Sequence, residues 1–202
     1  LRVGPKFIYV LPNFQNPSGS TLSLERRMQL VRIADKYGVP IIEDDPYGQL
    51  RYEGEHIPSI VALDSEHRGP NGGHYSGRVI YLSTFSKLLA PGLRLGWVIA
   101  PAEVIQKLVL SKQAADLHTS SFNQYIAFEA AKGGFLDEHV KLIRATYKER
   151  RDVMIEMMEE MFPAGVSWRK PKGGMFLWSI LPEGMDSSEV LKRAVEKKVA
   201  FV

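Results

Sequence analysis

Short apolar runs alternate with an amphipathic segment in the first part of the chain. Phe7 to Pro12 and Val39 to Glu43 are apolar runs of the length and composition typical of buried strands. Between them, residues 24–37 carry apolar side chains at helical spacing, with Ser23 as a candidate N-cap and Gly38 as a natural stop. Strand, helix and strand with short links predict a βαβ unit whose two strands pair in parallel.

Two further apolar runs predict a third and a fourth strand. They cover Val79 to Ser83 and Leu95 to Ala100. About ten residues separate them, which is too short a stretch for a helical crossover, so we expect the fourth strand to run antiparallel to the third. Residues 64–78 are polar and rich in glycine, and we expect them to form an exposed loop.

The second half of the chain is mostly helical in its pattern. It predicts helices over residues 102–115, 122–132 and 137–161, a strand over 175–180, a last helix capped by Asp186 or Ser187, and the start of a strand at 199–202. The whole pattern predicts an α/β fold with a mostly parallel sheet, followed by a smaller α+β domain. We place a large domain at residues 1–138 and a small one at 139–202, with the boundary inside the long helix.

Composition excludes several classes of protein. The net charge of the 202 residues is +3, and the basic residues are spread among acidic ones, which argues against a nucleic-acid-binding face. No cysteine is present, so there is neither a disulfide framework nor a thiolate metal site. A reducing cytoplasm is compatible with this composition but not required by it, and a cytoplasmic location is our expectation. No apolar run approaches the length of a membrane span. The chain does not begin with Met, and we expect it to start inside a longer protein.

Polar side chains follow each predicted strand of the sheet. Asn16 follows the first strand, Asp44 ends the second, the segment 84–87 (Thr-Phe-Ser-Lys) follows the third, and Arg94 precedes the fourth. In open α/β sheets, ligands bind at the carboxyl ends of the parallel strands. The antiparallel fourth strand starts where the third one ends, so it returns Arg94 to the same rim. We therefore expect one site built from all four segments.

The residue types at this rim suit a phosphate held beside a reactive amine. Arg94 offers a planar fork to phosphate oxygens, and the hydroxyls of Thr84 and Ser86 add donors. Lys87 is an amine that becomes a nucleophile able to form a Schiff base when its pKa is lowered. A buried carboxylate such as Asp44 needs a positive partner, which a protonated ring nitrogen would supply. A metal site at Asp44 and Asp45 is the weaker interpretation, because no histidine cluster accompanies them.

Four motifs in this order resemble the fold-type-I pyridoxal 5′-phosphate (PLP) aminotransferases of classes I and II. They are Asn16-Pro17-Ser18-Gly19, Asp44-x-x-Tyr47, Ser83-Thr84-Phe85-Ser86-Lys87 and Gly92-Leu93-Arg94-Leu95-Gly96. The stretches 44–48 and 116–119 are similar to the branch that contains the 2-aminoadipate and kynurenine aminotransferases. That branch also includes the aminotransferase-like domains of GntR-type regulators. The resemblance covers essentially the whole chain.

The resemblance implies a PLP cofactor, a three-layer PLP-transferase-like fold and transamination between an amino acid and a 2-oxo acid, with 2-oxoglutarate as acceptor. Lys87 would form the Schiff base and carry the proton during the reaction, and Asp44 would pair with the pyridine nitrogen. Tyr47 and Asn16 would hydrogen-bond the ring's 3-oxygen. Three residues would bind the phosphate: Thr84, Ser86 and Arg94. It also implies a homodimer. We expect the polar break at residues 118–123 to be the segment that one subunit contributes to the site of the other.

Parts of the family's site have no counterpart in this chain. The upstream phosphate turn, the aromatic that stacks on the ring and the downstream arginine for the substrate carboxylate are unmatched, since Arg169 and Arg193 stand in the wrong context. We therefore expect a fragment. Two alternative functions stay open at this stage: a PLP-binding effector domain of a transcription regulator without turnover, and a PLP-dependent lyase or decarboxylase.

Overall fold

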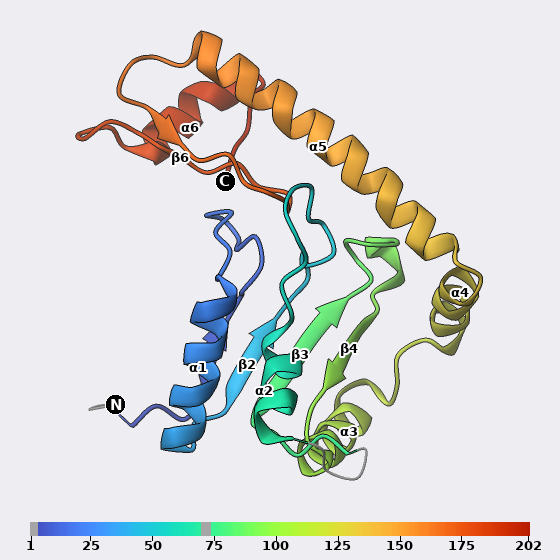
Figure 1. The fold of residues 1–202 in the computed structure, drawn as a ribbon. Coiled ribbons are helices and arrows are strands. Elements are labelled where there is room, and N and C mark those ends of the chain that lie inside the picture. The colour runs from blue at the N-terminus through green and yellow to red at the C-terminus, as the bar shows by residue number, and fades with distance from the viewer. Residues whose placement is uncertain (1–3, 70–73) are drawn as a thin grey trace.

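The computed structural model describes residues 4–69 and 74–202 and shows a four-stranded sheet with helices beside it (Figure 1). The strand order is β1-β2-β3-β4, with β1 to β3 parallel and β4 antiparallel to β3. This confirms the predicted α/β class and the predicted direction of the fourth strand. The strands are β1 (Ile8–Val10), β2 (Ile41–Asp44), β3 (Val79–Thr84) and β4 (Gly96–Ile99).

Helix α1 (Leu24–Tyr37) links β1 to β2 and has the bounds that its sequence predicts. The Ser23 hydroxyl accepts a hydrogen bond from the backbone N–H of Arg26 at 3.3 Å, which satisfies one of the free donors of the first turn. Gly38 ends the helix in the left-handed conformation, with φ of 66°, a conformation that glycine adopts without steric cost.

Helix α2 (Ile60–Arg68) corrects the expectation of a loop for residues 64–68, whereas Gly69 and residues 74–78 form neither helix nor strand. Ser59 caps its start, and the side chain of Asp64 is buried. The Asp64 carboxylate accepts hydrogen bonds from the hydroxyl of Tyr75 at 2.5 Å and from the backbone N–H of Arg78 at 2.9 Å. Some of the polar residues that predicted a loop thus make buried hydrogen bonds with Asp64 of a short helix. This helix is too short for its periodicity to stand out in the sequence. Residues 70–73 lie outside the described part of the chain.

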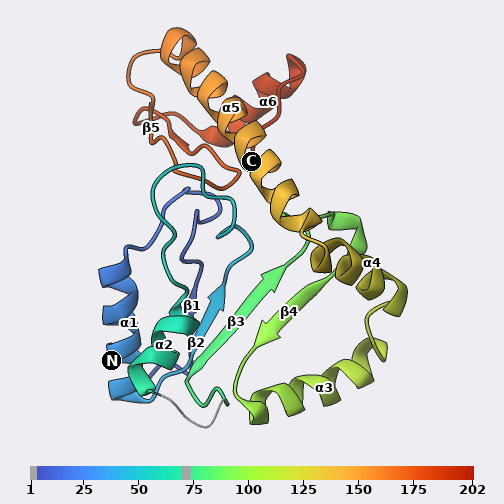
Figure 2. The same ribbon diagram turned by 45° about the vertical axis from the view of Figure 1, so that its right-hand side comes forward.

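The core of the sheet lies between its strands and the helices α1 and α2, which cover the same face (Figure 2). Its buried members come from α1, β2, α2 and β3: Val31, Ala34, Ile41, Ile60, Val61, Leu63 and Val79. The other face of the sheet carries Ile42 and Asp44 on β2, because side chains alternate along a strand.

The second half contains α3 (Ala102–Asp116), α4 (Ser121–Lys132), α5 (Phe135–Met161), β5 (Ser167–Trp168), β6 (Ser179–Ile180) and α6 (Ser187–Glu196), besides the 3-10 turn η1 (Pro91–Leu93) before β4. The strand expected over 175–180 is confined to β6, which pairs antiparallel with β5. The strand expected at 199–202 is wrong: these residues form no strand, since no neighbouring strand pairs with them.

The segment before β6 joins the C-terminal part of the chain to the sheet. The backbone N–H of Gly174 donates to the carbonyl of Leu50 at 2.8 Å, and that of Tyr52 donates to the carbonyl of Lys172 at 2.8 Å. On α5, the guanidinium of Arg151 binds Glu53 at 2.5 Å and the carbonyl of Pro171 at 2.5 Å. Because α5 runs unbroken through the proposed boundary, the division at residue 138 stays a prediction. Among the described residues, no helix is long and apolar enough to cross a membrane.

Glu43 is a buried carboxylate on the helix-covered face of β2. Its two oxygens accept hydrogen bonds from the backbone N–H groups of Ile60 and Val61, both at 2.8 Å, in the first turn of α2. Burial raises the pKa of Glu43 from its ordinary 4.5 to about 7, although the two N–H donors act in the opposite direction. Glu43 therefore anchors α2 to the sheet and takes up a proton near neutral pH.

The shifted pKa of Glu43 predicts how stability depends on pH. Between pH 4.5 and about 7 the folded chain keeps a proton that the unfolded chain releases, so the free energy of unfolding should fall as the pH rises through this window. Glu43→Gln removes the titration and should flatten that part of the curve. Denaturant unfolding of the intact protein at several pH values measures both slopes. Equal slopes for the wild type and the variant would contradict the assignment.

Candidate functional site

The carboxyl ends of β1, β2 and β3 meet at one rim of the sheet (Figure 2). A pocket of about 600 Å³ opens there. Its lining comes from β1, the segment that follows it and the end of β2, and it includes Tyr9, Leu11, Asn16, Thr21, Asp44 and Tyr47. The structure thus brings three of the sequence-predicted residues, Asn16, Asp44 and Tyr47, into a single pocket.

Asp44 places its carboxylate on the open face of the sheet, toward β1. The hydroxyl of Tyr9 donates a hydrogen bond to Asp44 Oδ2 at 2.5 Å. This bond, together with burial and the negative charge of Asp44, raises the pKa of Tyr9 to about 12. Tyr9 therefore stays a hydrogen-bond donor at neutral pH and fixes one oxygen of Asp44.

Tyr9 was not identified from the sequence as part of the site. Its register partner on β2 is Ile42, which lies on the same face as Asp44 two residues later. The alternation of side chains could have placed Tyr9 on this face, but only once the register of β1 against β2 was known.

Tyr47 lines the pocket and contacts the C-terminal part of the chain. It is buried, and its ring contacts that of Phe176 edge to face at 5.6 Å. Burial and the charge of Asp44 raise the pKa of Tyr47, while a hydrogen bond with the side chain of Asn16 lowers it. Asn16, Asp44 and Tyr47 therefore interact directly or through charge, although up to 31 positions separate them in the chain (47 − 16).

The segment after β3 forms a tight turn that carries the predicted lysine. The hydroxyl oxygen of Thr84 lies 2.8 Å from the carbonyl oxygen of Leu95 and 2.9 Å from the hydroxyl oxygen of Ser86. It also accepts the backbone N–H of Ser86 at 3.0 Å. Thr84 thus fixes the turn between β3 and β4, and Lys87 follows on it, half-buried.

Arg94 enters β4 in the left-handed conformation, with φ of 53°, and is exposed. Its guanidinium donates to the carbonyl of Pro91 at 3.1 Å. The side chain of Asn123, at the start of α4, donates to the carbonyl of Leu93 at 3.0 Å. The turn that contains Arg94 is therefore hydrogen-bonded to the polar break at residues 118–123. The Arg94 side chain itself is hydrogen-bonded to Pro91 of η1 and not to Thr84 or Ser86. The predicted role of Arg94 in binding phosphate is untested by this arrangement.

Asp45 points away from the pocket and shares the helix-covered face with Glu43. Its carboxylate accepts hydrogen bonds from Asn13 and Tyr81. Neither Asn13 nor Tyr81 was identified from the sequence as a site residue. Among residues 4–69 and 74–202, no group of three or more His, Asp or Glu side chains is arranged to hold a metal ion.

Comparison with known proteins identifies the family of this chain. Residues 3–201 match the family model described as aminotransferase class I and II. The chain belongs to the class I and II aminotransferases. The resemblance that the four motifs carry is thereby confirmed.

Individual members of this aminotransferase family are similar over nearly the whole chain. Aromatic-amino-acid aminotransferase 1 of Thermococcus litoralis is 49% identical over 197 residues, which are 98% of this chain and 45% of that protein. The structure of kynurenine aminotransferase from Pyrococcus horikoshii, solved in complex with PMP, is 47% identical with a TM-score of 0.89 and covers 98% of this chain and 46% of its own. LysN, the alpha-aminoadipate aminotransferase of Thermus thermophilus, is 39% identical with a TM-score of 0.91 over 98% of this chain and 49% of its own.

The chain thus spans a little under half the length of these relatives. Transcription regulators of the HTH type are among the relatives as well. Both kinds of protein named from the motifs, aminotransferases and regulators, are therefore represented.

Proposed function

We propose that this chain is the part of a PLP-dependent aminotransferase that holds the cofactor, and that the intact protein transfers an amino group from an amino acid to a 2-oxo acid, with 2-oxoglutarate as acceptor. The observation that carries the proposal is the pocket at the strand ends, where Asn16, Asp44 and Tyr47 converge. Leu88, which directly follows Lys87, belongs to the same buried cluster as Tyr47. The pocket's volume of about 600 Å³ lies within the range of cofactor pockets.

The residues at this rim fit PLP by their chemistry. Asp44 offers a carboxylate for a protonated ring nitrogen. The hydrogen bond from the Tyr9 hydroxyl holds this carboxylate in one orientation. Tyr47 and Asn16 offer a phenol and an amide to the ring's 3-oxygen. The hydroxyls of Thr84 and Ser86 and the guanidinium of Arg94 would hold the phosphate.

Bound PLP supplies an electron sink for the bonds at the substrate's α-carbon. Lys87 would hold the cofactor through its amine as a Schiff base. The Lys87 amine would also carry the proton between the substrate α-carbon and the cofactor's C4′. Asp44 would keep the ring nitrogen protonated through its negative charge.

Two other interpretations of the same site stay secondary. HTH-type regulators among the relatives favour a PLP-binding effector domain without turnover as the second candidate. A PLP-dependent lyase would use the same Lys87, Asp44 and Tyr47 and would differ in the substrate pocket. Turnover of an amino acid with 2-oxoglutarate by the intact protein would support the aminotransferase against both alternatives. A cytoplasmic location is also part of this proposal, and the cysteine-free composition is compatible with it.

Lys87→Ala tests the cofactor-holding residue. The intact wild-type protein, mixed with PLP, should show the visible absorption band of a lysine-linked cofactor, and Lys87→Ala should lose it together with transamination, because no other amine follows the third strand at this rim. Borohydride reduction followed by peptide mapping locates the modified residue. Lys112→Ala, on the exposed face of α3, is the matched control and should keep the band. A label on Lys36 or Lys112 would refute the assignment.

Asp44→Ala tests the partner of the ring nitrogen. Loss of a preorganised charge beside the reacting ring lowers turnover by roughly a hundredfold or more. We expect that loss in the kcat for transamination, with Lys87 still able to hold the cofactor. Asp137→Ala changes an exposed aspartate at the start of α5 and should behave like the wild type. Near-normal turnover in Asp44→Ala would eliminate this role.

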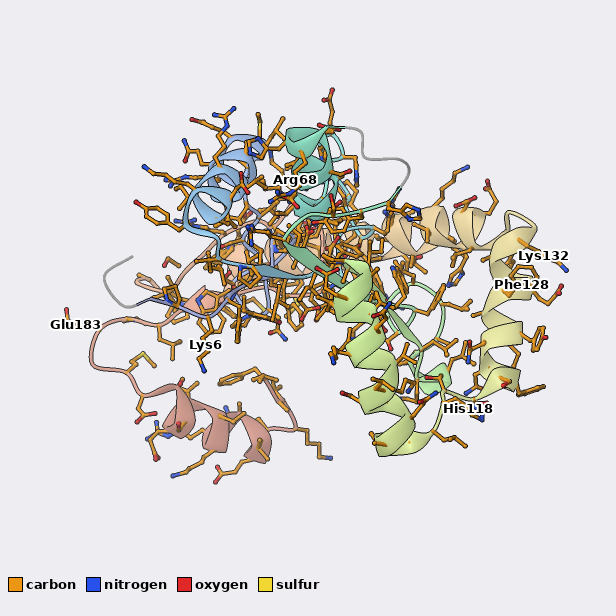
Figure 3. The ribbon with its side chains drawn as sticks, turned by 90° about the horizontal axis from the view of Figure 1, so that it is seen from below. Lys6, Arg68, His118, Phe128, Lys132 and Glu183 are labelled. Atoms are coloured by element: carbon orange, nitrogen blue, oxygen red, sulfur yellow. The ribbon has the colours of Figure 1, made fainter. Side chains whose placement is uncertain are left out.

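A homodimer is the second part of the proposal, and exposed apolar side chains on α3 and α4 support it. In α4, Phe122 is 73% exposed and Tyr125 is 69% exposed. Figure 3 labels His118, between α3 and α4, and Phe128 and Lys132 on α4. Large exposed aromatic side chains of this kind are typical of surfaces that another protein segment covers. The adjacent break at 118–123 is tied to the Arg94 turn by Asn123, so a partner bound there would lie beside the site.

Phe122→Asp tests the dimer surface. The intact wild-type protein should sediment with twice the mass of its chain, and Phe122→Asp should shift it toward the monomer, because a charge in an apolar interface is strongly unfavourable. Leu142→Asp is the matched control: Leu142 is 63% exposed on α5, and its variant should stay dimeric. An active wild-type monomer at low concentration would contradict the dimer.

A further inference from the structure

Asp45 connects the ends of all three parallel strands through its side chain and its backbone. Its Oδ1 accepts the amide N–H of Asn13 at 2.9 Å, in the segment after β1. Its backbone carbonyl accepts the Ser83 hydroxyl at 2.8 Å, its backbone N–H donates to the Leu82 carbonyl at 2.9 Å, and its Oδ2 lies 3.3 Å from the Tyr81 hydroxyl, all three on β3. Asp45 itself directly follows β2. One residue therefore touches each of the three strand ends that deliver the site.

A buried arginine supplies the opposite charge behind this contact. Arg27 of α1 has no exposed surface, and its guanidinium donates to the amide oxygen of Asn13 at 2.5 Å and to the carbonyl of Pro12 at 3.2 Å. The Asn13 amide thus stands between a cation on one side and the Asp45 carboxylate on the other. This order fixes which way the amide points, because its oxygen faces Arg27 and its N–H faces Asp45.

This arrangement leaves no room for a side chain at position 48, which is a glycine. A β-carbon at position 48 would lie 2.3 Å from Asp45 Oδ2, 2.7 Å from Asp45 Oδ1 and 2.9 Å from the Asn13 amide nitrogen. These distances are shorter than any van der Waals contact, so any other residue would displace the carboxylate. Gly48 directly follows Tyr47, and its backbone lies against the Asp45 carboxylate.

We propose that Asp45, with Asn13, Arg27 and Gly48, is a positioning residue of the active site. It does not touch the pocket. It fixes the spacing of the segments that carry Asn16, Asp44 and Lys87, each of which follows or ends a strand that Asp45 binds. This inference rests on the proposed function, because it assigns Asp45 to the same cofactor site. Groups that act together on one cofactor must be held to within about 0.5 Å, which the pairing of such short strands does not secure alone.

Two independent substitutions should produce the same defect. Asp45→Asn removes the charge and one acceptor, and Gly48→Ala displaces the carboxylate without changing it. In the intact protein, each should weaken PLP binding about tenfold or more, the factor that corresponds to one lost charge-assisted hydrogen bond. Each should also shift the pH midpoint of the bound cofactor's absorption band. If Gly48→Ala acts through Asp45, the double variant should be no worse than the more severe single variant.

The controls use the same chemical changes at neutral positions. Gly133→Ala adds a β-carbon that meets nothing within 4 Å, and Asp137→Asn removes an exposed charge. Both should match the wild type. Thermal unfolding without PLP is measured for every variant, since a purely structural role lowers stability and leaves the absorption midpoint in place.

The outcomes separate this inference from the proposed function. If the wild type binds no PLP, both are overturned. If the wild type binds PLP and both variants keep its affinity and its absorption midpoint, Asp45 has no positioning role and the proposed function stands. Additive losses in the double variant would also contradict the inference that Gly48 acts by leaving room for the Asp45 carboxylate. Weak binding, a shifted midpoint and non-additivity together support the inference.

Discussion

The register of three parallel strands is the constraint on which the site depends. Ile41 pairs with Ile8 on one side and with Val79 on the other, and this alignment decides which face each later side chain occupies. Asp44 and Asp45 are neighbours with opposite surroundings: one faces the pocket and Tyr9, the other faces Asn13 and Tyr81. A slip of β2 by one residue would exchange them, because side chains alternate with a period of two. A carboxylate would still stand in the pocket, but the one behind it would lose its partners.

Buried polar groups on the helix-covered face make such a slip unfavourable. Glu43 binds the first turn of α2, and Arg27 donates to carbonyls from three separate segments as well as to Asn13. A buried charge without partners destabilises a fold by several kcal/mol, about 3 to 5 for a broken pair. Hydrophobic residues alone would tolerate several registers, whereas these groups are satisfied in one. The polar network therefore contributes specificity to the sheet in addition to any stability, and the site obtains its geometry from that specificity.

Periodicity and turn chemistry were enough to predict the sheet strands, α1 and the antiparallel β4, because each has a strong local pattern. The convergence of Asn16 and Asp44 also followed, since it needs only the rule that parallel strands end at one rim, whereas Tyr47 was assigned to the site by the resemblance. The contributions of Tyr9, Asn13 and Asp45 did not follow, because each depends on a cross-strand partner that only the register reveals. Helix α2 was missed for a related reason: its polar residue Asp64 looks like a loop residue until its buried partners, such as Tyr75, are known. The roles assigned to Lys87 and Arg94 rest on the resemblance and stay predictions.

Gly173 and Gly174 had no clear role in the sequence, but the structure shows why glycine is required at both positions. A β-carbon on Gly173 would lie 2.4 Å from both the Leu50 carbonyl and the Phe14 ring, and one on Gly174 would lie 2.5 Å from the Phe14 side chain. Only glycine lets this backbone approach so closely. Phe14 is buried beneath it, two residues before Asn16, and Leu50 is three residues after Tyr47. The C-terminal segment therefore packs on the two loops that line the pocket, so the position of Asn16 and Tyr47 depends on residues more than a hundred positions away as well as on the strands that precede them.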